Sequence, residues 1–522
     1  MNQPTPSPQP GLARSLGPVV AMALVVGTVI GSGVFKKPSL IAEKVPYSGI
    51  VALMWIVGGI LVVLGALAYS EVCVLLPRAG GNYVFLREGY GRLAGFLWGW
   101  VEFWIIRTAS IAALATIFIE SLNDILKSPG IDLPLSFWIQ KLSIVATILL
   151  LSAINVRGVK WGGGLQVFIT IVKVGSLLAI LAMPLIALVV TMRSVPSSAN
   201  FRPMWPDDWS TVRIGGVGSA FIGVLWAYHG WMNISPVAEE VRQPQRNLPL
   251  ALLGGVAVVV FLYLGANLAY YSTIPGPEMA QLSKERLPAA VGIMTGGAGV
   301  GLPNRLQSTP VATEMFRRLL GPLGMLLASG AIMCSVFGAL NGNLLVGPRL
   351  LYAMGDDGLA PQALRAVHPR YRTPAAAIWV MGGWAALLVL SVAVLTETGV
   401  LQKGKSHFDY LTDFAMFGAV IFETMAVVSI FVLRRTMPDA ERPYRCWGYP
   451  VVPALYVILP VFMVGNYLVN DQAEALGAGG IIAAGVLVYY LLGLNGTGPQ
   501  AKQPPDAGEP FASDRKATAG VV

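Results

Sequence analysis

Two short stretches of small residues interrupt apolar segments and could expose backbone groups able to bind a small charged molecule. The first lies at 27–35 and the second at 226–231. In hydrocarbon an unpaired backbone group costs several kcal/mol, so a helix break at membrane depth is tolerated only where protein or a polar ligand completes it. Two such breaks in corresponding positions of two halves indicate the substrate site of a secondary transporter.

The first stretch predicts a site with two poles. If the helix unwinds at 31–33, the amides of residues 32–34 become free donors at the start of an outer half-helix, where the helix dipole also favours a carboxylate. The carbonyls of Val29 and Ile30 end the inner half-helix and suit an ammonium group. A zwitterionic amino acid fits both ends, and glycines let it approach the backbone closely. The alternative is a small-residue packing face.

The second stretch predicts further carbonyls and a set of gating side chains. Trp226 has the area to close over a bound ligand, and Tyr228 follows closely. Trp and Tyr also gather at membrane interfaces, which is the alternative explanation. His229 is one of three histidines. It could titrate near neutral pH or act only as a hydrogen-bonded spacer.

Other polar residues fall inside apolar segments. Lys173 lies well inside one, where a lysine is costly and therefore a functional hypothesis. Its ammonium could take the place of a sodium ion against the carbonyls of the first stretch, or exchange a proton; snorkelling to an interface is the alternative. Glu102 and Arg107, five residues apart, lie on neighbouring helix faces and are interpreted as structural. Asn341 could lie close to a substrate.

The composition places the chain in a bilayer. Of 522 residues, 55% are apolar and 12% charged, and the mean hydropathy is +0.65. Soluble domains carry about 25% charged residues. The net charge of +9 is scattered through loops, so nucleic-acid binding is not expected. Three cysteines without CxxC spacing support neither a disulfide framework nor a zinc site. No catalytic motif is present, so neither an enzyme nor a cofactor is expected.

Hydropathy predicts about twelve transmembrane helices, because a span needs about 20 apolar residues. The predicted spans are 18–40, 48–75, 92–121, 138–156, 162–192, 213–238, 248–272, 321–354, 374–396, 408–433, 449–469 and 475–494. Basic residues concentrate in alternate short loops, which predicts that both termini are cytoplasmic. The connection at 273–320 is then external, with a Gly-rich insertion at 283–308.

Spans one to five and six to ten share a layout in which each half begins with a broken helix. An odd number of spans per half gives the halves opposite topology, which predicts inverted repeats. The predicted divisions are a disordered tail at 1–16, a first repeat at 17–195, a second at 196–435, two further helices at 436–495 and a disordered tail at 496–522.

The chain resembles the amino acid–polyamine–organocation superfamily, in its L-type amino acid transporter branch. The resemblance covers about residues 15–490 and rests on four groups of residues. These are the Gly-Ser-Gly stretch at 27–35, the motif at 227–249, the Leu-Ala-Tyr-Tyr stretch at 268–271, and the residues at 77–81, 102, 107, 341–342 and 349–350.

The resemblance implies an all-helical, leucine-transporter-like fold. It has a five-plus-five inverted repeat, two C-terminal helices, unwound helices 1 and 6, and alternating access. It also implies that amides matching Ser32 and Gly33 bind the substrate carboxylate, and that carbonyls matching Val29, Trp226 and His229 bind the amine. The lysine matching Lys173 is typical of members that do not use sodium.

Three features depart from the family pattern. His229 stands where the family usually has Gly or a small or acidic residue, Trp226 stands where Phe is usual, and the insertion has no counterpart. Residues 121–136 contain no cysteine. A disulfide-linked ancillary subunit, found in animal members, is therefore not expected.

The expected function is a sodium-independent L-amino acid permease of the cytoplasmic membrane. It would be an exchanger or a proton-coupled importer, with the amino acid and the lipid bilayer as partners and, in the proton-coupled case, protons as well. The alternatives are a polyamine or organic-cation carrier and a non-transporting amino acid sensor. The candidate binding residues are Val29, Ile30, Gly31, Ser32, Gly33, Trp226, Ala227, His229 and Asn341. The candidate coupling and gating residues are Lys173, Trp226, Tyr228 and His229.

Overall fold

The computed structural model describes residues 16–127, 131, 133–157, 162–191, 197–283, 310–398 and 407–495. Within these residues the chain is helical and forms no strand, only an isolated bridge between Leu16 and Val241. The tails expected at 1–16 and 496–522 and the insertion at 283–308 lie almost wholly outside the described residues.

The described residues contain the following helices. In chain order they are α1 (Pro18–Val29), α2 (Gly33–Lys44), α3 (Ser48–Leu75), α4 (Asn82–Tyr90), α5 (Arg92–Val101), the π-helix η1 (Glu102–Arg107), α6 (Thr108–Leu126), α7 (Phe137–Val156), α8 (Gly162–Thr191), η3 (Ser198–Phe201), η4 (Trp209–Thr211), α9 (Ile214–Tyr228), η5 (Trp231–Glu240), α10 (Pro244–Thr273), α11 (Gly276–Gln281), α12 (Val311–Asp356), η6 (Gln362–Arg365), α13 (Ala375–Glu397), α14 (His407–Thr436), α15 (Val451–Asn470) and α16 (Gln472–Leu491).

Eleven spans among the described residues are long and apolar enough to cross a membrane. They correspond to all the predicted spans except that at 213–238. There the helix α9 has 15 residues and stops at Tyr228, and the chain continues as the 3₁₀ helix η5. The predicted span at 213–238 is therefore present as two shorter pieces, because its sequence breaks in the middle.

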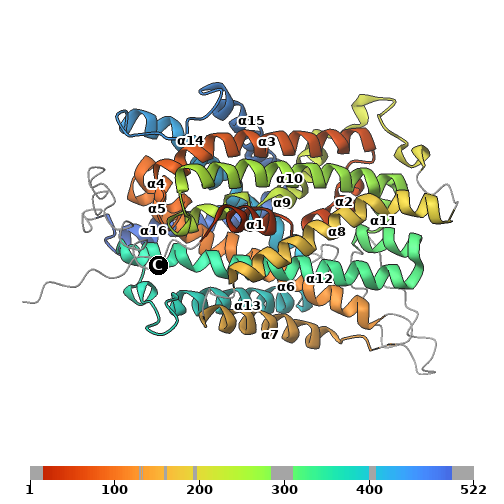
Figure 1. The fold of residues 1–522 in the computed structure, drawn as a ribbon, viewed down its shortest axis with the longest axis horizontal. Helices are drawn as coiled ribbons and strands as arrows, with labels where there is room; N and C mark the ends of the chain where they lie inside the picture. Colours follow the sequence, from red (N-terminus) through yellow and green to blue (C-terminus); the bar gives the residue numbers. More distant parts are fainter. Residues whose placement is uncertain are drawn as a thin grey trace, which may run out of the picture.

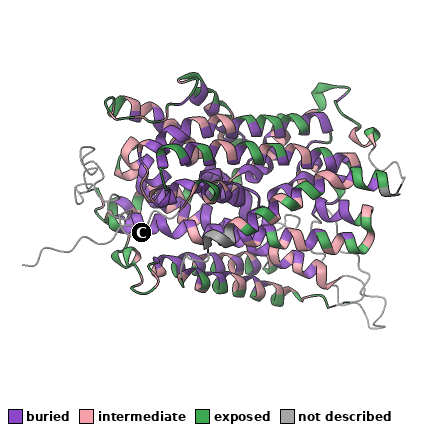
Figure 2. Ribbon diagram, in the orientation of Figure 1, coloured by how far each residue is buried: buried purple, intermediate pink, exposed green. Residues whose placement is uncertain are grey.

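The long helices run side by side along the long axis of the molecule (Figure 1). The short helix α1 lies near the middle of the bundle, where it contacts α8 and α10. Buried residues gather in this central region, whereas outer helices such as α7 expose one face (Figure 2). The breaks are thus surrounded by other helices, which can complete their backbone hydrogen bonds.

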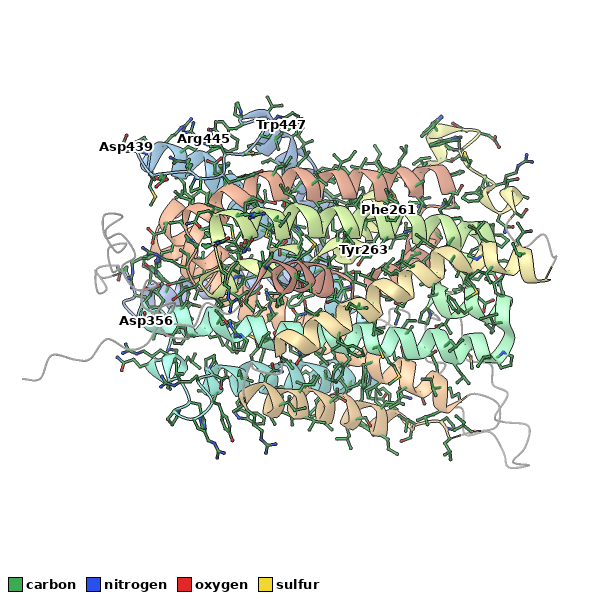
Figure 3. All side chains as sticks on the ribbon, in the orientation of Figure 1. Phe261, Tyr263, Asp356, Asp439, Arg445 and Trp447 are labelled. Carbon is green, nitrogen blue, oxygen red and sulfur yellow. The ribbon has the colours of Figure 1, made fainter. Side chains whose placement is uncertain are left out.

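Helix α10 illustrates how one helix separates lipid from interior. Phe261 is 65% exposed and Tyr263, two residues on, is fully buried (Figure 3). Residues two apart on a helix point about 200° away from each other. An exposed phenylalanine on a long apolar helix is suited to contact lipid, and the opposite face delivers the tyrosine hydroxyl to the centre of the bundle.

Charged residues collect at the ends of the bundle. Asp356, Asp439 and Arg445 lie towards one end in Figure 3. The exposed side chain of Trp447 lies in the same region, in the connection between α14 and α15. An indole at the edge of an apolar belt is typical of a membrane interface.

Two local features were not predicted. The predicted span at 92–121 is α5, η1 and α6 in succession, with a π-helical turn at its centre. Helix α12 begins ten residues before its predicted start and kinks at Gly321, whose φ is 66° and which precedes Pro322. A π-helical turn inside a long helix is frequently found at a functional site.

Candidate binding site at the two helix breaks

The first break separates α1 from α2. Helix α1 ends at Val29, Ile30 has a non-helical φ/ψ of −70° and 89°, and α2 begins at Gly33. No side chain caps the start of α2. The amides at 31–34 have no hydrogen-bond acceptor among the described residues. Free amide donors and a helix N-terminus therefore meet at the centre of the bundle.

Side chains from other helices explain why these amides stay free. In a continuous helix, the amides of residues 31, 33 and 34 would bond the carbonyls of Gly27, Val29 and Ile30. Instead the Lys173 ammonium on α8 donates to Gly27 O at 2.5 Å and to Ile30 O at 2.8 Å. The Tyr263 hydroxyl on α10 donates to Val29 O at 3.0 Å. These donors satisfy the carbonyl side of the break and leave its amide side open.

Lys173 is fully buried and reaches the first break directly. The position excludes snorkelling to an interface, since Nζ lies against two carbonyl oxygens in the bundle interior. The Ser335 hydroxyl of α12 adds a longer bond of 3.3 Å to Ile30 O. An ammonium among main-chain carbonyl oxygens has the surroundings that a sodium ion would need.

Gly33 is required by packing as well as by any ligand. A Cβ added there would lie 2.4 Å from the Cα of Ala227 on α9, closer than the two backbones can tolerate. At Gly31 the same Cβ would lie 3.4 Å from a Leu114 side-chain atom, which is ordinary contact. The predicted reason for both glycines was ligand approach; for Gly33 the structure adds a direct contact between the two broken segments.

The second break follows α9 and touches the first. Gly230 adopts a left-handed conformation with φ 102°, which ends the helix as glycine commonly does. The Thr28 hydroxyl of α1 donates to Gly230 O at 3.1 Å. The Tyr228 hydroxyl donates to Trp55 O on α3 at 3.3 Å. The ring of Tyr228 also packs against the rings of Trp55 and Tyr263.

The side chains of Trp226 and His229 form the other face of the second break. Their rings are stacked, with centroids 6.0 Å apart and an interplanar angle of 11°. Trp226 also meets Phe408 of α14 edge to face. His229 Nε2 lies 3.0 Å from Glu423 Oε1 of α14. The second break thus presents these side chains in addition to backbone groups, while the first presents backbone amides.

A cavity lies between the two breaks, and we call it the break cavity. Its volume is about 30 Å³, far below the about 300–1,000 Å³ that is usual for ligand pockets, so it is a narrow cavity. Its lining residues are Thr28, Val29, Gly31, Ser32, Gly33, Ser110, Leu114, Trp226, His229, Gly230, Asn233 and Asn343. The buried Ser32 hydroxyl has no hydrogen-bond partner among the described residues, so a polar atom is available at the start of α2.

Most, but not all, of the predicted binding residues line this cavity. Ile30 and Ala227 lie next to it in the chain but are not among the lining residues. Asn341 is also absent from the lining, and its Oδ1 accepts a hydrogen bond of 2.9 Å from Asn155 on α7. Asn343, two residues later on α12, lines the cavity instead.

Sequence reasoning missed a polar network beside the cavity. The Arg107 guanidinium donates from Nε to Glu102 Oε1 at 2.7 Å, from Nη1 to Asn343 Oδ1 at 2.6 Å and from Nη2 to Asn233 Oδ1 at 2.9 Å. Residues five apart do not face each other on an α-helix, but the π-helix η1 places them on one face. The sequence feature that could have indicated this network was the oppositely charged pair Glu102 and Arg107 inside an apolar segment.

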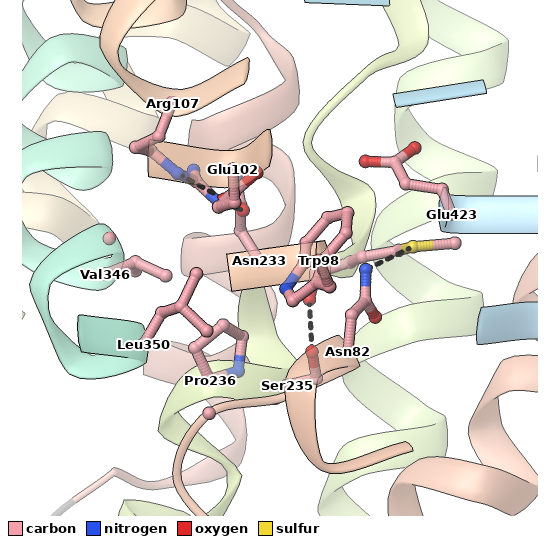
Figure 4. A pocket seen from close by; sticks show the side chains of 13 residues that line it. Asn82, Trp98, Glu102, Arg107, Asn233, Ser235, Pro236, Val346, Leu350 and Glu423 are labelled. Carbon is pink, nitrogen blue, oxygen red and sulfur yellow. Dashed lines mark hydrogen bonds and ion pairs between the residues drawn. The ribbon is translucent and has the colours of Figure 1, made fainter. Parts of the chain in front are cut away.

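A second cavity, the charged cavity, adjoins this network (Figure 4). Glu102, Arg107 and Glu423 line it, and Asn233 lines both cavities. Its remaining lining residues are Gly80, Asn82, Trp98, Met232, Ser235, Pro236, Val346, Gly347 and Leu350.

Buried ion pairs connect the segments that follow the two breaks to the rest of the bundle. After the first break, Lys37 Nζ lies 2.7 Å from Asp409 Oδ1 on α14, and Lys36 Nζ lies 2.9 Å from Glu120 Oε2 on α6. After the second, Arg349 Nε lies 2.9 Å from Glu240 Oε1. Breaking one such pair costs about 3–5 kcal/mol. The buried ion pairs of α2 were not predicted. The adjacent Lys36 and Lys37 in an apolar segment are the sequence feature that could have indicated them.

An apolar helical bundle with two adjoining helix breaks and a small polar cavity between them defines a membrane transport protein. The chain matches the amino acid permease family over residues 16–492. It belongs to that family, which confirms the resemblance to the amino acid–polyamine–organocation superfamily.

Relatives extend over almost the whole chain. It is 30% identical over 482 residues to the serine/threonine exchanger SteT of Bacillus subtilis, covering 92% of this chain and 97% of the relative. It is 28% identical to the human cystine/glutamate transporter, covering 92% of this chain and 85% of the relative. It is 27% identical to the human b(0,+)-type amino acid transporter 1, covering 92% of this chain and 88% of the relative.

The family, the relatives and the apolar helices together identify the chain as a multi-pass membrane protein that transports amino acids. It is a permease and not an enzyme, as expected from the sequence.

Proposed function

We propose that the chain is a sodium-independent amino acid permease that binds its substrate between the two helix breaks. The carboxylate of the amino acid accepts hydrogen bonds from the amides of Ser32 and Gly33 and from the Ser32 hydroxyl. The main support is that the amides at 31–34 are unpaired among the described residues, at the positive end of a 12-residue helix and beside a cavity. A helix N-terminus with free amides is a favourable site for an anion.

The substrate ammonium is assigned to carbonyl oxygens on the opposite side of the break cavity. The proposed acceptors are the carbonyls of Val29, Trp226 and His229. A carbonyl oxygen has two lone pairs, and Val29 O and Trp226 O each accept one bond from the protein, from Tyr263 and from the His229 amide. Each can accept a second bond from an ammonium.

Sodium independence is supported by Lys173. Its ammonium lies between Gly27 O and Ile30 O, where it supplies a fixed positive charge to the break. A cation bound there would lie within a few ångströms of that charge and be repelled.

The break cavity favours a small substrate with a polar side chain. Its lining includes the polar residues Ser110, Asn233 and Asn343. Side-chain hydroxyl or amide groups on a substrate would find hydrogen-bond partners there. We assign contact with the substrate side chain to Asn343, and a supporting role to Asn341 through Asn155. SteT, whose name describes it as a serine/threonine exchanger, is consistent with a small polar substrate.

The transport cycle is proposed to be alternating access on a five-plus-five inverted repeat, at 17–195 and 196–435, with the helices at 436–495 outside the repeats. Exchange is the proposed mode, since one relative is an exchanger by name. The protein is placed in the cell membrane with both termini cytoplasmic, as the loop charges predict. No disulfide-linked subunit is proposed, because residues 121–136 contain no cysteine.

A polyamine or organic-cation carrier fits the site less well. The described residues that line the break cavity include no acidic side chain. Glu102 is paired with Arg107 and Glu423 with His229. A cation without a carboxylate would leave the amides of α2 unpaired in the interior, at a cost of about 1–3 kcal/mol for each group.

The test is uptake into proteoliposomes that contain purified protein. A thermal-shift screen over the twenty amino acids, with polyamines added, first selects the ligand that stabilises the protein most. Its radiolabelled form should enter vesicles preloaded with unlabelled amino acid, with equal rates in sodium and in choline buffer. Binding without uptake would indicate a sensor, and uptake that requires sodium would contradict the role of Lys173. Stabilisation by polyamines alone would contradict the substrate class.

A further inference from the structure

Three ionisable side chains line the charged cavity, and a fourth, His229, contacts one of them. Glu102 and Arg107 come from η1, Glu423 from α14, and His229 from the turn after α9. Arg107 binds Glu102, and His229 Nε2 lies 3.0 Å from Glu423 Oε1. All four are largely buried (Figure 4 shows three of them). We call these residues the charge cluster.

The charge of the cluster depends on His229. With a neutral imidazole, the two carboxylates and one guanidinium sum to −1. With an imidazolium, they sum to zero. An uncompensated charge inside a membrane protein is costly, so one added proton balances the cluster.

A buried carboxylate oxygen of Glu102 without a hydrogen-bond donor in the described part of the chain indicates that negative charge is in excess in the cluster. Its Oε1 receives the Arg107 bonds, and Oε2 is buried with no hydrogen-bond partner among the described residues. A carboxylate oxygen without a donor in a buried site is rare, because it loses hydration without compensation. Additional positive charge at the cluster would stabilise it.

Among the residues that the structure describes, no other group around the cluster is placed to supply this charge. The phenols of Tyr69 on α3 and Tyr456 on α15 are the nearby titratable groups of those helices. The lining residues contributed by α12 and η5 are uncharged. Lys173 on α8 is engaged by the carbonyls of the first break and makes no ion pair among the described residues. Lys36 and Lys37 of α2 are paired with other carboxylates.

The cluster also borders the binding site. His229 lines the break cavity, while its partner Glu423 lines the charged cavity. Arg107 bonds Asn233, which lines both, and Asn343, which lines the break cavity. A conformational change that joins the two cavities must therefore move Arg107, His229 and Glu423 relative to one another.

We propose that the charge cluster carries one exchangeable proton, held by His229 against Glu423, and that this proton makes transport through the break cavity pH-dependent. The inference deepens the proposed function and rests on it. Nε2–H of His229 donates to the ionised Glu423, so the proton from water is added at Nδ1 and gives an imidazolium beside a carboxylate. The reverse step returns the proton to water and restores the neutral ring.

The proton is detected directly by nuclear magnetic resonance. The chain has three histidines, so the protein labelled with ¹³C at histidine Cε1, in lipid nanodiscs, gives three signals. His229→Gln removes one and thereby assigns it. That signal should shift when the pH is varied, and Glu423→Gln should alter this response. A His229 signal that does not change with pH would overturn the proposal.

Uptake tests whether the proton matters for transport. Initial rates are measured in proteoliposomes at equal pH on both sides, with the amino acid that the thermal-shift screen selects. The wild-type rate should change by at least about fivefold between about pH 5 and about pH 8, and that of His229→Gln by less than about twofold. Gln keeps an N–H donor for Glu423 but cannot titrate in this range.

The matched control is His368→Gln, in the connection between α12 and α13 and away from both cavities. It should keep the wild-type pH profile. A His229→Gln profile equal to that of the wild type would contradict the inference while leaving the proposed function intact. Absence of uptake of any amino acid by the wild type would contradict the proposed function, and the resonance titration would still report on the proton.

Discussion

The two helix breaks differ in the groups they present to the cavity. At the first, side chains of α8 and α10 occupy the carbonyls of Gly27, Val29 and Ile30, and the amides that follow are left open. At the second, the chain continues into η5, and the amides of His229 and Asn233 are bonded to nearby carbonyls. Its side chains of Trp226 and His229 line the cavity together with the backbone of Gly230, and its Trp226 and His229 carbonyls are the proposed acceptors for the substrate ammonium.

We propose that the first break binds the substrate carboxylate through its backbone amides, while the second binds the ammonium through carbonyls and also shapes and tunes the site through its side chains. Backbone donors do not depend on side-chain identity, so every amino acid substrate can use them through its carboxylate. Side chains can vary, and they set which substrates fit and how transport depends on conditions. Substitutions at the two breaks should therefore fail in different ways.

The largest expected effect is that of Gly33→Ala. The added Cβ would lie 2.4 Å from the Ala227 backbone and push the two breaks apart, so uptake should fall by at least about 100-fold, a barrier change of about 2.7 kcal/mol. The matched variant Gly31→Ala has room and should keep most activity. Proteoliposome uptake, with thermal stability measured in parallel, compares them. Equal activities would show that contact between the breaks does not matter.

Lys173→Ala should have the next largest effect. Gly27 O and Ile30 O lose a charged donor in a buried place, and the amides of Gly31 and Val34 can then reclaim them and close the break. We expect substrate affinity to fall by at least about tenfold, or about 1.4 kcal/mol. Thr170→Val is the control, because it removes a bond from α8 to Ala23 O on α1 away from the break. Equilibrium binding of the selected amino acid measures both. Wild-type affinity in Lys173→Ala would show that the lysine does not hold the break open.

Tyr263→Phe should have a moderate effect. It removes only the hydroxyl bonded to Val29 O, and a single neutral hydrogen bond contributes about 1 kcal/mol, or about fivefold in affinity. Tyr270→Phe, on the same helix, removes a buried hydroxyl that has no partner among the described residues and should change affinity little. A larger loss in Tyr270→Phe than in Tyr263→Phe would argue against the capping of the first break by α10.

The smallest effect on the substrate is expected for Asn341→Ala. Asn341 bonds Asn155 and does not line the break cavity, so the KM should stay within about threefold while the melting temperature falls, because Asn155 loses a buried partner. A tenfold rise in KM with unchanged stability would return Asn341 to the binding site.

The sequence predicted the class of fold and the positions of both breaks because these depend on local composition. Long apolar runs and the small residues at 30–33 are visible without a structure. Lys173 could also be recognised, since a lysine in an apolar segment needs an internal partner. Each of these features can be predicted from one segment of the sequence, by comparing that segment with what a lipid bilayer requires of a spanning helix.

The missing parts of the site depend on contacts between distant segments. Tyr263 looks like any aromatic residue of an apolar helix until α10 is packed against α1. Glu423 and His229 are 194 residues apart, and nothing local links them. The interpretation of Glu102 and Arg107 assumed α-helical geometry, whereas η1 brings them onto one face. A choice between Asn341 and Asn343 required the orientation of α12.

The central claim is that the open amides of α2 bind the substrate carboxylate. The most direct measurement compares the affinity of the purified protein for the selected amino acid with its affinity for the corresponding amide, which keeps the side chain and amine but lacks the negative charge. The account predicts that the amide binds at least about 100-fold more weakly, a loss of about 2.7 kcal/mol, because a charge-assisted bond to backbone donors is lost. Equal affinities for the two compounds would contradict it.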